Sequence, residues 1–337
     1  MEPTTVDMHD DKQAEDFFAV YHAAHVADTP DEPPPLRDEF LALGRQESAE
    51  VRTAFEAVYA DNEMVGAGMV VMPTIDNTHL ADVKIWVRPQ HRRRGAGRAL
   101  LAQLTRHARD AERRTLFAQA LGPVPGGPPR DGAGARFLEA AGFTAVLSMV
   151  SRRVDLTGVD AAAEQALLEQ CLPHATEYDT VTWDGTTPDP LAAGVATVTN
   201  RTNTDAPRGG MDIEQATLDA RRLHAEERQW LDAGSQLVGA AAVHRPTGEV
   251  AAVTSIGVRP SGDHGRIRTT IAHPVHRGHR LGTLVKIEAH RQVRRLFPQL
   301  RYVSTSNADA NDHMVAINEK LGYAAYQTGT NYQRRLD

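Results

Sequence analysis

The amino-acid sequence predicts an α/β protein (a mixed α+β sheet) built of two tandem domains, each with a central mixed β-sheet flanked by helices. Three observations predict this fold: a repeated basic motif, a repeated order of strand and helix patterns, and the chain length. The motif HPVHRGHRLG at His273–Gly282 keeps the order of proline, histidine, arginine and glycine found in RPQHRRRGAG at Arg88–Gly97, 185 residues earlier. A chain of 337 residues is also too long for one typical core. We therefore predict domains at 1–157 and 158–337.

The order of predicted elements is the same around both motifs. Each half reads as three strands, the motif, a helix, a strand, a second helix and a last strand, because alternating and helical hydrophobic spacings follow one another in that order. In the first half two helices precede this unit, and the predicted elements are helices 12–25 and 35–43, strands 54–61, 63–72 and 80–87, helix 97–114, strand 115–120, helix 135–142 and strand 143–154. In the second half they are strands 235–245, 249–260 and 265–272, helix 282–297, strand 300–307, helix 311–322 and strand 323–336.

Composition limits the function classes. Hydrophobic residues make up 41% and charged residues 24% of the chain, which is ordinary for a globular protein. The net charge of −7 argues against nucleic acid as a partner. The single cysteine, Cys171, excludes an internal disulfide and a cysteine-rich metal site. No window approaches a membrane span, so we expect no membrane partner and a cytoplasmic protein, as a monomer or homodimer.

The first motif has the chemistry of a phosphate-binding loop. In RRRGAG at Arg92–Gly97, glycines allow a tight turn whose backbone N–H groups face inward without obstruction. The following helix adds about half a positive charge at its N-terminus, and the arginines add full charges. The dinucleotide fingerprint and the Walker loop both fit poorly, since neither Gly-x-Gly-x-x-Gly nor Gly-Lys-Ser/Thr is present.

The same residues resemble a known family. RRRGAG matches every fixed position of the acyl-CoA loop signature, Gln/Arg-x-x-Gly-x-Gly/Ala, of the GNAT superfamily of N-acetyltransferases. Together with the segments at 76–97, 203–212 and 307–323, the sequence is similar to tandem GNAT proteins of actinobacteria, with the two-lobed architecture of mycothiol synthase. The resemblance implies acetyl-CoA as co-substrate and no metal. The cofactor-binding residues that it implies are Trp86, Val87, Arg92, Arg93, Arg94, Gly95, Ala96, Gly97 and Arg98 in the first lobe, and Ile271, Ala272, Arg277, Gly278, His279, Arg280, Leu281 and Gly282 in the second.

The second loop departs from this signature, because Arg280 stands where a glycine is expected. An arginine at this position would either add a phosphate contact or fill the cradle with its side chain and leave the second lobe structural. The sequence leaves both alternatives open.

The reaction that the resemblance implies is direct attack of an amine on the thioester carbonyl. Deprotonating an alkylamine of pKa about 10.4 at neutral pH costs about 4.6 kcal/mol, so a general base is useful. The resemblance places the backbone N–H that stabilises the oxyanion near Val87 in the first lobe and near Ile271–Ala272 in the second.

Candidate catalytic residues come from the segment NDHMVAINEKLGY. Many relatives have an asparagine and, seven positions later, a tyrosine acid; here Asn311 takes the first position and Asn318 replaces the tyrosine. The same register in the first lobe gives Asp131 and Leu138. We therefore expect catalysis in the second lobe, with Asn307 and Asn311 positioning the cofactor or the leaving sulfur. The alternative for Asn311 is to cap a helix.

The sequence also offers candidate residues for binding the acceptor amine and for a metal ion. The stretch TEYDTVTWDG (176–185) offers carboxylates beside Tyr178 and Trp183, either as a seat for a cation or as solvated loop residues. Asp205 is likewise either part of a site for a cation or a solvated loop residue. His264 is either a general base or an exposed turn residue. The spacing of His273, His276 and His279 suits zinc, but the sequence shows no accompanying carboxylate or fourth ligand, so no metal is predicted.

The predicted function is transfer of an acetyl group from acetyl-CoA to a primary amine of a small molecule, such as an amino sugar, an antibiotic or a mycothiol-type precursor. A peptide or protein N-terminus is the alternative acceptor. The alternative from another class is a non-catalytic acyl-CoA-binding or regulatory protein, which the missing tyrosine and Arg280 would favour.

Overall fold

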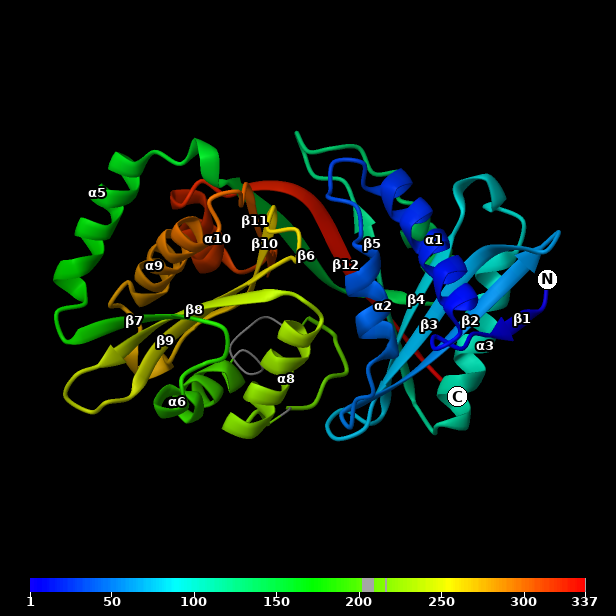
Figure 1. The fold of residues 1–337 in the computed structure, drawn as a ribbon, viewed down its shortest axis with the longest axis horizontal. Helices are drawn as coiled ribbons and strands as arrows, with labels where there is room; N and C mark the ends of the chain where they lie inside the picture. Colours follow the sequence, from blue (N-terminus) through cyan, green and yellow to red (C-terminus); the bar gives the residue numbers. More distant parts are fainter. Residues whose placement is uncertain (202–208, 216, 337) are drawn as a thin grey trace. The chain divides into compact units, whose positions relative to one another are not determined.

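The structure, a computed structural model, describes residues 1–201, 209–215 and 217–336 (Figure 1). The chain forms two compact units. The first lobe comprises Met1–Ser148, Arg208–Glu214 and Gln327–Asp337, and the second comprises Met149–Pro207 and Gln215–Tyr326. Each compact unit therefore contains segments from both halves of the sequence. The boundary between the repeats at 157/158 stays a prediction.

The first lobe has a mixed sheet in the order β1-β2-β3-β4-β5-β12. All neighbours are antiparallel except β4 and β5, which are parallel. Its strands are β1 (Pro3–Thr5), β2 (Val51–Ala60), β3 (Glu63–Pro73), β4 (Leu80–Val87), β5 (Thr115–Gly122) and β12 (Ala324–Arg335). Its helices are α1 (Asp11–Asp28), α2 (Arg37–Arg45), α3 (Ala96–Asp110) and α4 (Ala133–Ala140), with a short 3-10 turn at Pro89–His91.

The second lobe repeats this topology in the order β7-β8-β9-β10-β11-β6, and β10–β11 is its parallel pair. Its strands are β6 (Thr144–Asp155), β7 (Tyr178–Asp184), β8 (Gln236–His244), β9 (Val250–Val258), β10 (His264–Ala272) and β11 (Tyr302–Ala308). Its helices are α5 (Ala161–Cys171), α6 (Asp189–Asn200), α8 (Ala220–Asp232), α9 (Leu281–Leu296) and α10 (Asp312–Lys320), with 3-10 turns at Leu156–Gly158, Leu172–His174 and Pro274–His276.

The last strand of each sheet comes from the other half of the sequence. Residues 328–335 of β12 pair antiparallel with β5, so the first sheet is completed by the C-terminal strand of the chain. Residues 149–155 of β6 pair antiparallel with β11 and complete the second sheet. Both predicted last strands exist, and each pairs with a strand of the opposite half.

Small residues let the helix after the first loop approach the sheet closely. The predicted apolar face of α3 is buried at Leu100, Leu104 and Ala108. A Cβ at Gly66 of β3 would lie 3.1 Å from Leu100 Cδ1, and one at Gly68 would lie 3.1 Å from Leu104 Cδ1. Because β3 carries glycine at both contacts, α3 packs directly on the strand that supports β4.

Helices cover both faces of the second sheet (Figure 1). Ala240 and Ala242 of β8 pack in the core that α9 covers, whereas Ala241 packs in the core that α6 covers. This alternation is what a strand buried on both faces requires. Among the described residues, no helix combines the length and the apolar character needed to cross a membrane.

Candidate active site

The loop between β4 and α3 presents an open backbone turn. Arg93 and Gly95 have left-handed backbone angles, with φ of 63° and 94°, and α3 begins at Ala96. A Cβ built at Gly95 would meet no atom within 4 Å. The space in front of the N-terminus of α3 is therefore free for an anion, which the helix dipole and the free N–H groups favour.

The arginines of this loop divide into one brace and several exposed groups. Arg92 donates two hydrogen bonds, of 2.7 and 2.9 Å, to the carboxylate of Asp28 at the end of α1. Its Nε also donates to the carbonyl of Val87 at 3.1 Å. Arg93, Arg94 and Arg98 are exposed. Arg92 thus fixes the loop to α1, whereas the other three guanidinium groups leave positive charge exposed beside the turn.

The parallel strands β4 and β5 separate beside this loop. They pair only from Leu80 to Asp82 of β4, so the rest of β4 is not hydrogen-bonded to β5. The N–H of Arg88 donates to the carbonyl of Val65 at 2.9 Å. Since N–H groups alternate in direction along a strand, the N–H of Val87 faces away from β3, on the side where β5 has separated. The predicted oxyanion donor therefore faces the separation between the strands.

Trp86, predicted as a cofactor contact, belongs to an aromatic cluster. Its ring lies 4.8 Å from the ring of Tyr21 and 6.2 Å from that of Phe17, both on α1. Gly97 lies under α4, where a Cβ would be 3.6 Å from Phe137. These contacts fix the end of β4 and the first turn of α3 to their surroundings.

The second loop has the same backbone form with its glycine at the other position. Gly278 and Arg280 take the left-handed angles here, with φ of 87° and 55°. Arg280 donates to the carbonyl of Gln170 on α5 at 3.0 Å, and His279 Nδ1 lies 2.8 Å from the carbonyl oxygen of His174. Two side chains of this loop are therefore bound to the C-terminal end of α5 and the turn that follows.

The remaining predicted cofactor residues of the second lobe keep the positions that the repeat implies. Leu281 is buried at the start of α9, and a Cβ at Gly282 would lie 3.4 Å from Ile317. Strands β10 and β11 pair only at 264–266 and 302–304, and then separate. The N–H of His273 donates to the carbonyl of Ala251 at 2.8 Å, so the N–H of Ala272 faces the separation. Arg277 is exposed, and Ile271 is half-buried.

The predicted catalytic asparagines both have hydrogen-bond partners inside the second lobe. Asn311 caps α10, because its Oδ1 accepts from the N–H of Met314 at 3.2 Å. Asp131, its counterpart in the first lobe, accepts from the N–H of Ala133 at 2.7 Å. Asn307 Oδ1 accepts from the amide of Asn318 at 2.6 Å. The structure thus brings Asn307 and Asn318 together and gives Asn311 the role of a helix cap.

Sequence reasoning missed a buried polar group in the second lobe. Lys286 of α9 is fully buried and donates to Asn318 Oδ1, and burial lowers the pKa of Lys286 to about 7. One turn further, His290 Nε2 lies 2.7 Å from the hydroxyl of Tyr323, and burial lowers the pKa of His290 to about 3. The signal in the sequence was a lysine inside the apolar face of a helix, in a chain with four lysines.

Two interpretations of polar residues need correction. His264 is buried at the start of β10, where burial lowers its pKa to about 4, so it is not an exposed turn residue. The stretch with Tyr178 and Trp183 forms strand β7 rather than a loop, and the two rings lie in the cores on opposite faces of the sheet. They do not form one seat for a cation. Asp205 lies outside the described residues.

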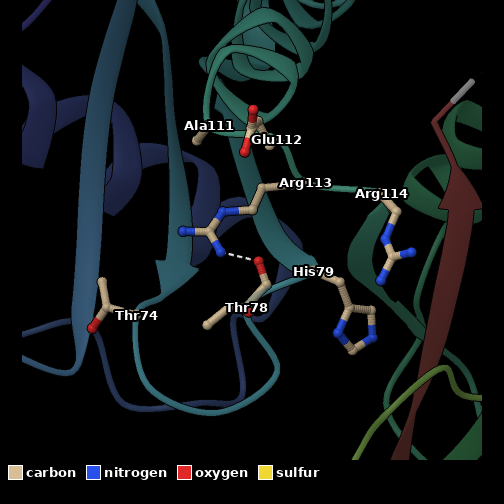
Figure 2. A pocket seen from close by; sticks show the side chains of 7 residues that line it. All are labelled: Thr74, Thr78, His79, Ala111, Glu112, Arg113 and Arg114. Atoms are coloured by element: carbon tan, nitrogen blue, oxygen red, sulfur yellow. Dashed lines mark hydrogen bonds between the residues drawn. The ribbon is translucent and has the colours of Figure 1, made fainter.

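A pocket lies at the opposite end of β4 from the loop. It is lined by Thr74, Thr78, His79, Ala111, Glu112, Arg113 and Arg114 (Figure 2). Arg113 donates to the carbonyl of Thr78 across it. Because it lies where β4 and β5 begin, it is separate from the loop and the strand separation, which lie where β4 ends.

The comparisons with known proteins agree with this geometry. Residues 14–121 match the model of the acetyltransferase (GNAT) family. The chain carries a GNAT acetyltransferase domain. It is thus an acyltransferase, and a GNAT fold implies an acyl-CoA donor and an acceptor substrate. No curated protein sequence matches the chain.

Solved structures extend the likeness to both lobes. A tandem GNAT protein from the clavulanic acid biosynthesis pathway, solved without AcCoA, is 26% identical with a TM-score of 0.82, covering 99% of this chain and 98% of that chain. A GCN5-related N-acetyltransferase from Sphaerobacter thermophilus has 14% identity, a TM-score of 0.67 and coverage of 99% and 95%. The tandem GNAT fold predicted from the sequence is confirmed.

Proposed function

We propose that this GNAT protein transfers an acetyl group from acetyl-CoA to a primary amine of a small molecule by direct attack. The acceptor class is an amino sugar, an antibiotic or a mycothiol-type precursor. The similarity of 99% of the chain to a tandem GNAT protein from the clavulanic acid biosynthesis pathway supports a small acceptor over a peptide or protein N-terminus.

The observation that carries the proposal is the open turn at Gly95. Its backbone faces free space at the start of α3, and a side chain there would occupy the space that a diphosphate needs. The exposed guanidinium groups of Arg93, Arg94 and Arg98 would neutralise the phosphates and the coenzyme's other charges. The open turn and the exposed arginines of the first lobe therefore fit the diphosphate of acyl-CoA.

The strand separation beside this turn supplies the catalytic environment. The N–H of Val87 would donate to the carbonyl oxygen of the thioester as it becomes an oxyanion. The leaving thiolate has a pKa of about 8.5, so protonating it helps but is not essential. Deprotonating the amine is the more costly step, and a base or a water chain would serve it.

The second lobe is the alternative place for the chemistry, through Asn307 and Asn311. Asn311→Ser separates the two roles of this residue, because serine keeps the helix cap and removes the amide. If Asn311 acts on substrate, Asn311→Ser loses turnover while its unfolding midpoint stays near that of the wild type. If Asn311 only caps α10, Asn311→Ser keeps turnover and Asn311→Ala loses about 1 kcal/mol of stability.

The test of the function is thiol release from acetyl-CoA with a panel of primary amines, including amino sugars, aminoglycosides, cysteinyl glycosides and short peptides. We expect an amine-dependent release of free CoA with at least one small amine. Tight binding of acetyl-CoA in calorimetry without thiol release across the panel would establish the non-catalytic alternative. Turnover with peptides alone would move the acceptor to that class.

A further inference from the structure

A cluster of histidine and carboxylate side chains lies where the β8–β9 hairpin meets the turn that opens the second loop. It consists of His244 at the end of β8, Glu249 before β9 and His276 in the Pro274–His276 turn. One ligand atom from each of these three side chains lies within 4.8 Å of the other two. All three residues belong to the second lobe.

Hydroxyl groups hold both imidazole rings in a ligand-like orientation. The hydroxyl of Tyr178 lies 3.0 Å from Nδ1 of the buried His276. Thr247 Oγ1 lies 3.0 Å from Nδ1 of His244 and donates to Glu249 Oε2 at 3.1 Å. Because the threonine hydroxyl has one hydrogen and gives it to Glu249, Nδ1 of His244 carries the proton in that pair. Its Nε2 then has the free lone pair that a metal ligand needs.

The other nitrogen of each ring, Nε2, faces a carboxylate. His276 Nε2 lies 3.7 Å from Glu249 Oε2, and His244 Nε2 lies 3.9 Å from Oε2 of Glu177, which precedes β7. These pairs are longer than hydrogen bonds. The carboxylate side chains of Glu177 and Glu249 are 65% exposed, so they can turn toward a shared ion while the buried His276 stays fixed.

We propose that His244, His276 and Glu249 form a Zn²⁺ site, with Glu177 as the fourth ligand. Two imidazoles and one or two carboxylates are a donor set that zinc takes in tetrahedral sites. Zn–N and Zn–O distances of about 2.0–2.2 Å place neighbouring ligand atoms about 3.3 Å apart. The present separations therefore require movements of the order of 1 Å, which the exposed carboxylates provide. The hydroxyls of Tyr178 and Thr247 are the outer partners that orient such ligands.

The site differs from the zinc pattern considered in the sequence. Of His273, His276 and His279, only His276 joins it, and His279 Nδ1 contacts the carbonyl oxygen of His174 instead. The carboxylates that the sequence did not reveal come from the hairpin and from the residue before β7. A bound ion would tie the hairpin to the start of the second loop.

The test uses the full-length protein after treatment with a chelator, and it does not depend on acetyl transfer. Zinc binding is measured by competition with a chromophoric chelator, and thermal unfolding is measured with and without Zn²⁺. We expect one Zn²⁺ per chain, and Co²⁺ in the same site should give the strong visible absorption of tetrahedral coordination. The unfolding temperature of the wild type should rise with Zn²⁺.

Variants locate the ion. His244→Ala and His276→Ala should each weaken Zn²⁺ binding by at least about 100-fold, Glu249→Gln by about 10-fold or more, and His279→Ala, the neighbouring control, should bind as the wild type does. Glu249→Gln is the variant with the lowest risk of misfolding, because the Glu249 side chain is 65% exposed, whereas those of His244 and His276 are 16% and 9% exposed. Thermal unfolding without metal checks that each variant is folded. Absence of binding to the wild type, or equal binding by His244→Ala and the wild type, would overturn the proposal.

Discussion

The two loops have the same backbone turn but different residues at its second left-handed position. Gly95 stands there in the first loop and Arg280 in the second, with φ of 94° and 55°. An arginine can therefore take this turn, at a cost of about 1–2 kcal/mol. Backbone geometry alone does not require glycine at Gly95. An added Cβ would meet no atom within 4 Å at Gly95, and the same holds at Gly278 of the second loop. The two loops therefore differ in the side chain of Arg280, which donates to the carbonyl of Gln170.

The cores beneath the loops differ at equivalent positions. Below the first loop, apolar Leu101 of α3 and Leu138 of α4 are buried in one cluster. Below the second, their counterparts in the repeat are Lys286 and Asn318, which bond to each other. The same fold thus holds an apolar pair in one lobe and a hydrogen-bonded polar pair in the other.

Of the variants that compare the two lobes, Gly95→Glu is expected to have the largest effect, which is on acyl-CoA binding to the first lobe. The bulky anionic side chain would fill the free space and should abolish acyl-CoA binding to the first lobe. Calorimetry should then show one binding site fewer, or an affinity lower by about 100-fold or more. Gly185→Glu is the matched control, because Gly185 also has a positive φ of 76° and no atom within 4 Å of an added Cβ. An unchanged stoichiometry in Gly95→Glu would show that the first loop does not hold the coenzyme.

The next largest effect is expected on stability, in a double-mutant cycle at Lys286 and Asn318. Asn318→Leu leaves the buried Lys286 without its hydrogen-bond acceptor and should lower the free energy of unfolding by about 1–3 kcal/mol. Lys286→Leu combined with Asn318→Leu recreates the apolar pair of the first lobe and should recover most of that loss. Urea unfolding of the two single variants and the double variant gives the coupling energy. Additive losses would contradict the equivalence of the two pairs.

The pH dependence of stability should differ between the wild type and Lys286→Leu. Burial lowers the pKa of Lys286 from 10.5 to about 7, so between these values the unfolded state binds the proton and the folded state does not. This lysine therefore makes the free energy of unfolding rise with pH in that window. From pH about 7 to about 9 the rise is about 2–3 kcal/mol. Lys286→Leu should lack this part of the slope, and parallel slopes would show that the lysine is charged in the fold.

Arg280→Gly is expected to have the smallest effect. It removes the hydrogen bond to Gln170 and relieves the left-handed arginine, two changes of about 1 kcal/mol that oppose each other in stability. It also gives the second loop the glycine of the signature. We expect the acyl-CoA affinity of the second lobe to rise by about threefold to tenfold in calorimetry of a Gly95→Glu background. A fall in affinity would mean that Arg280 contacts phosphate.

Hydrophobic spacing predicted much of the fold. The bounds predicted for strand 80–87 are those of β4, because buried Ala81 and Val83 alternate with polar Asp82 and Lys84. The predicted helix 97–114 overlaps α3, because α3 has one apolar face. Strand β7 was missed because its acidic residues suggested a loop, although its neighbour β8 is buried and needs a partner. The strand exchange could not be predicted, since periodicity within β6 and β12 gives no information on their partners.

The site was predicted in its backbone and not in its side-chain contacts. The glycine signature located both turns, because turn geometry is local in sequence. The cap at Asn311 was one of the two predicted alternatives, because its partner Met314 lies only three residues further on. The ion pair of Arg92 with Asp28 and the burial of Lys286 against Asn318 depend on residues brought together by folding. Their spacing in the sequence has no period that indicates the contact.

The exchanged strands also link protein synthesis to folding. β5 ends at Gly122, whereas its partner β12 begins only at Ala324, so during translation β5 is made long before its β12 neighbour. An exposed strand edge of this kind is a site for wrong pairing. A gene fragment that stops after the first motif and its helices would encode a lobe with that edge permanently open.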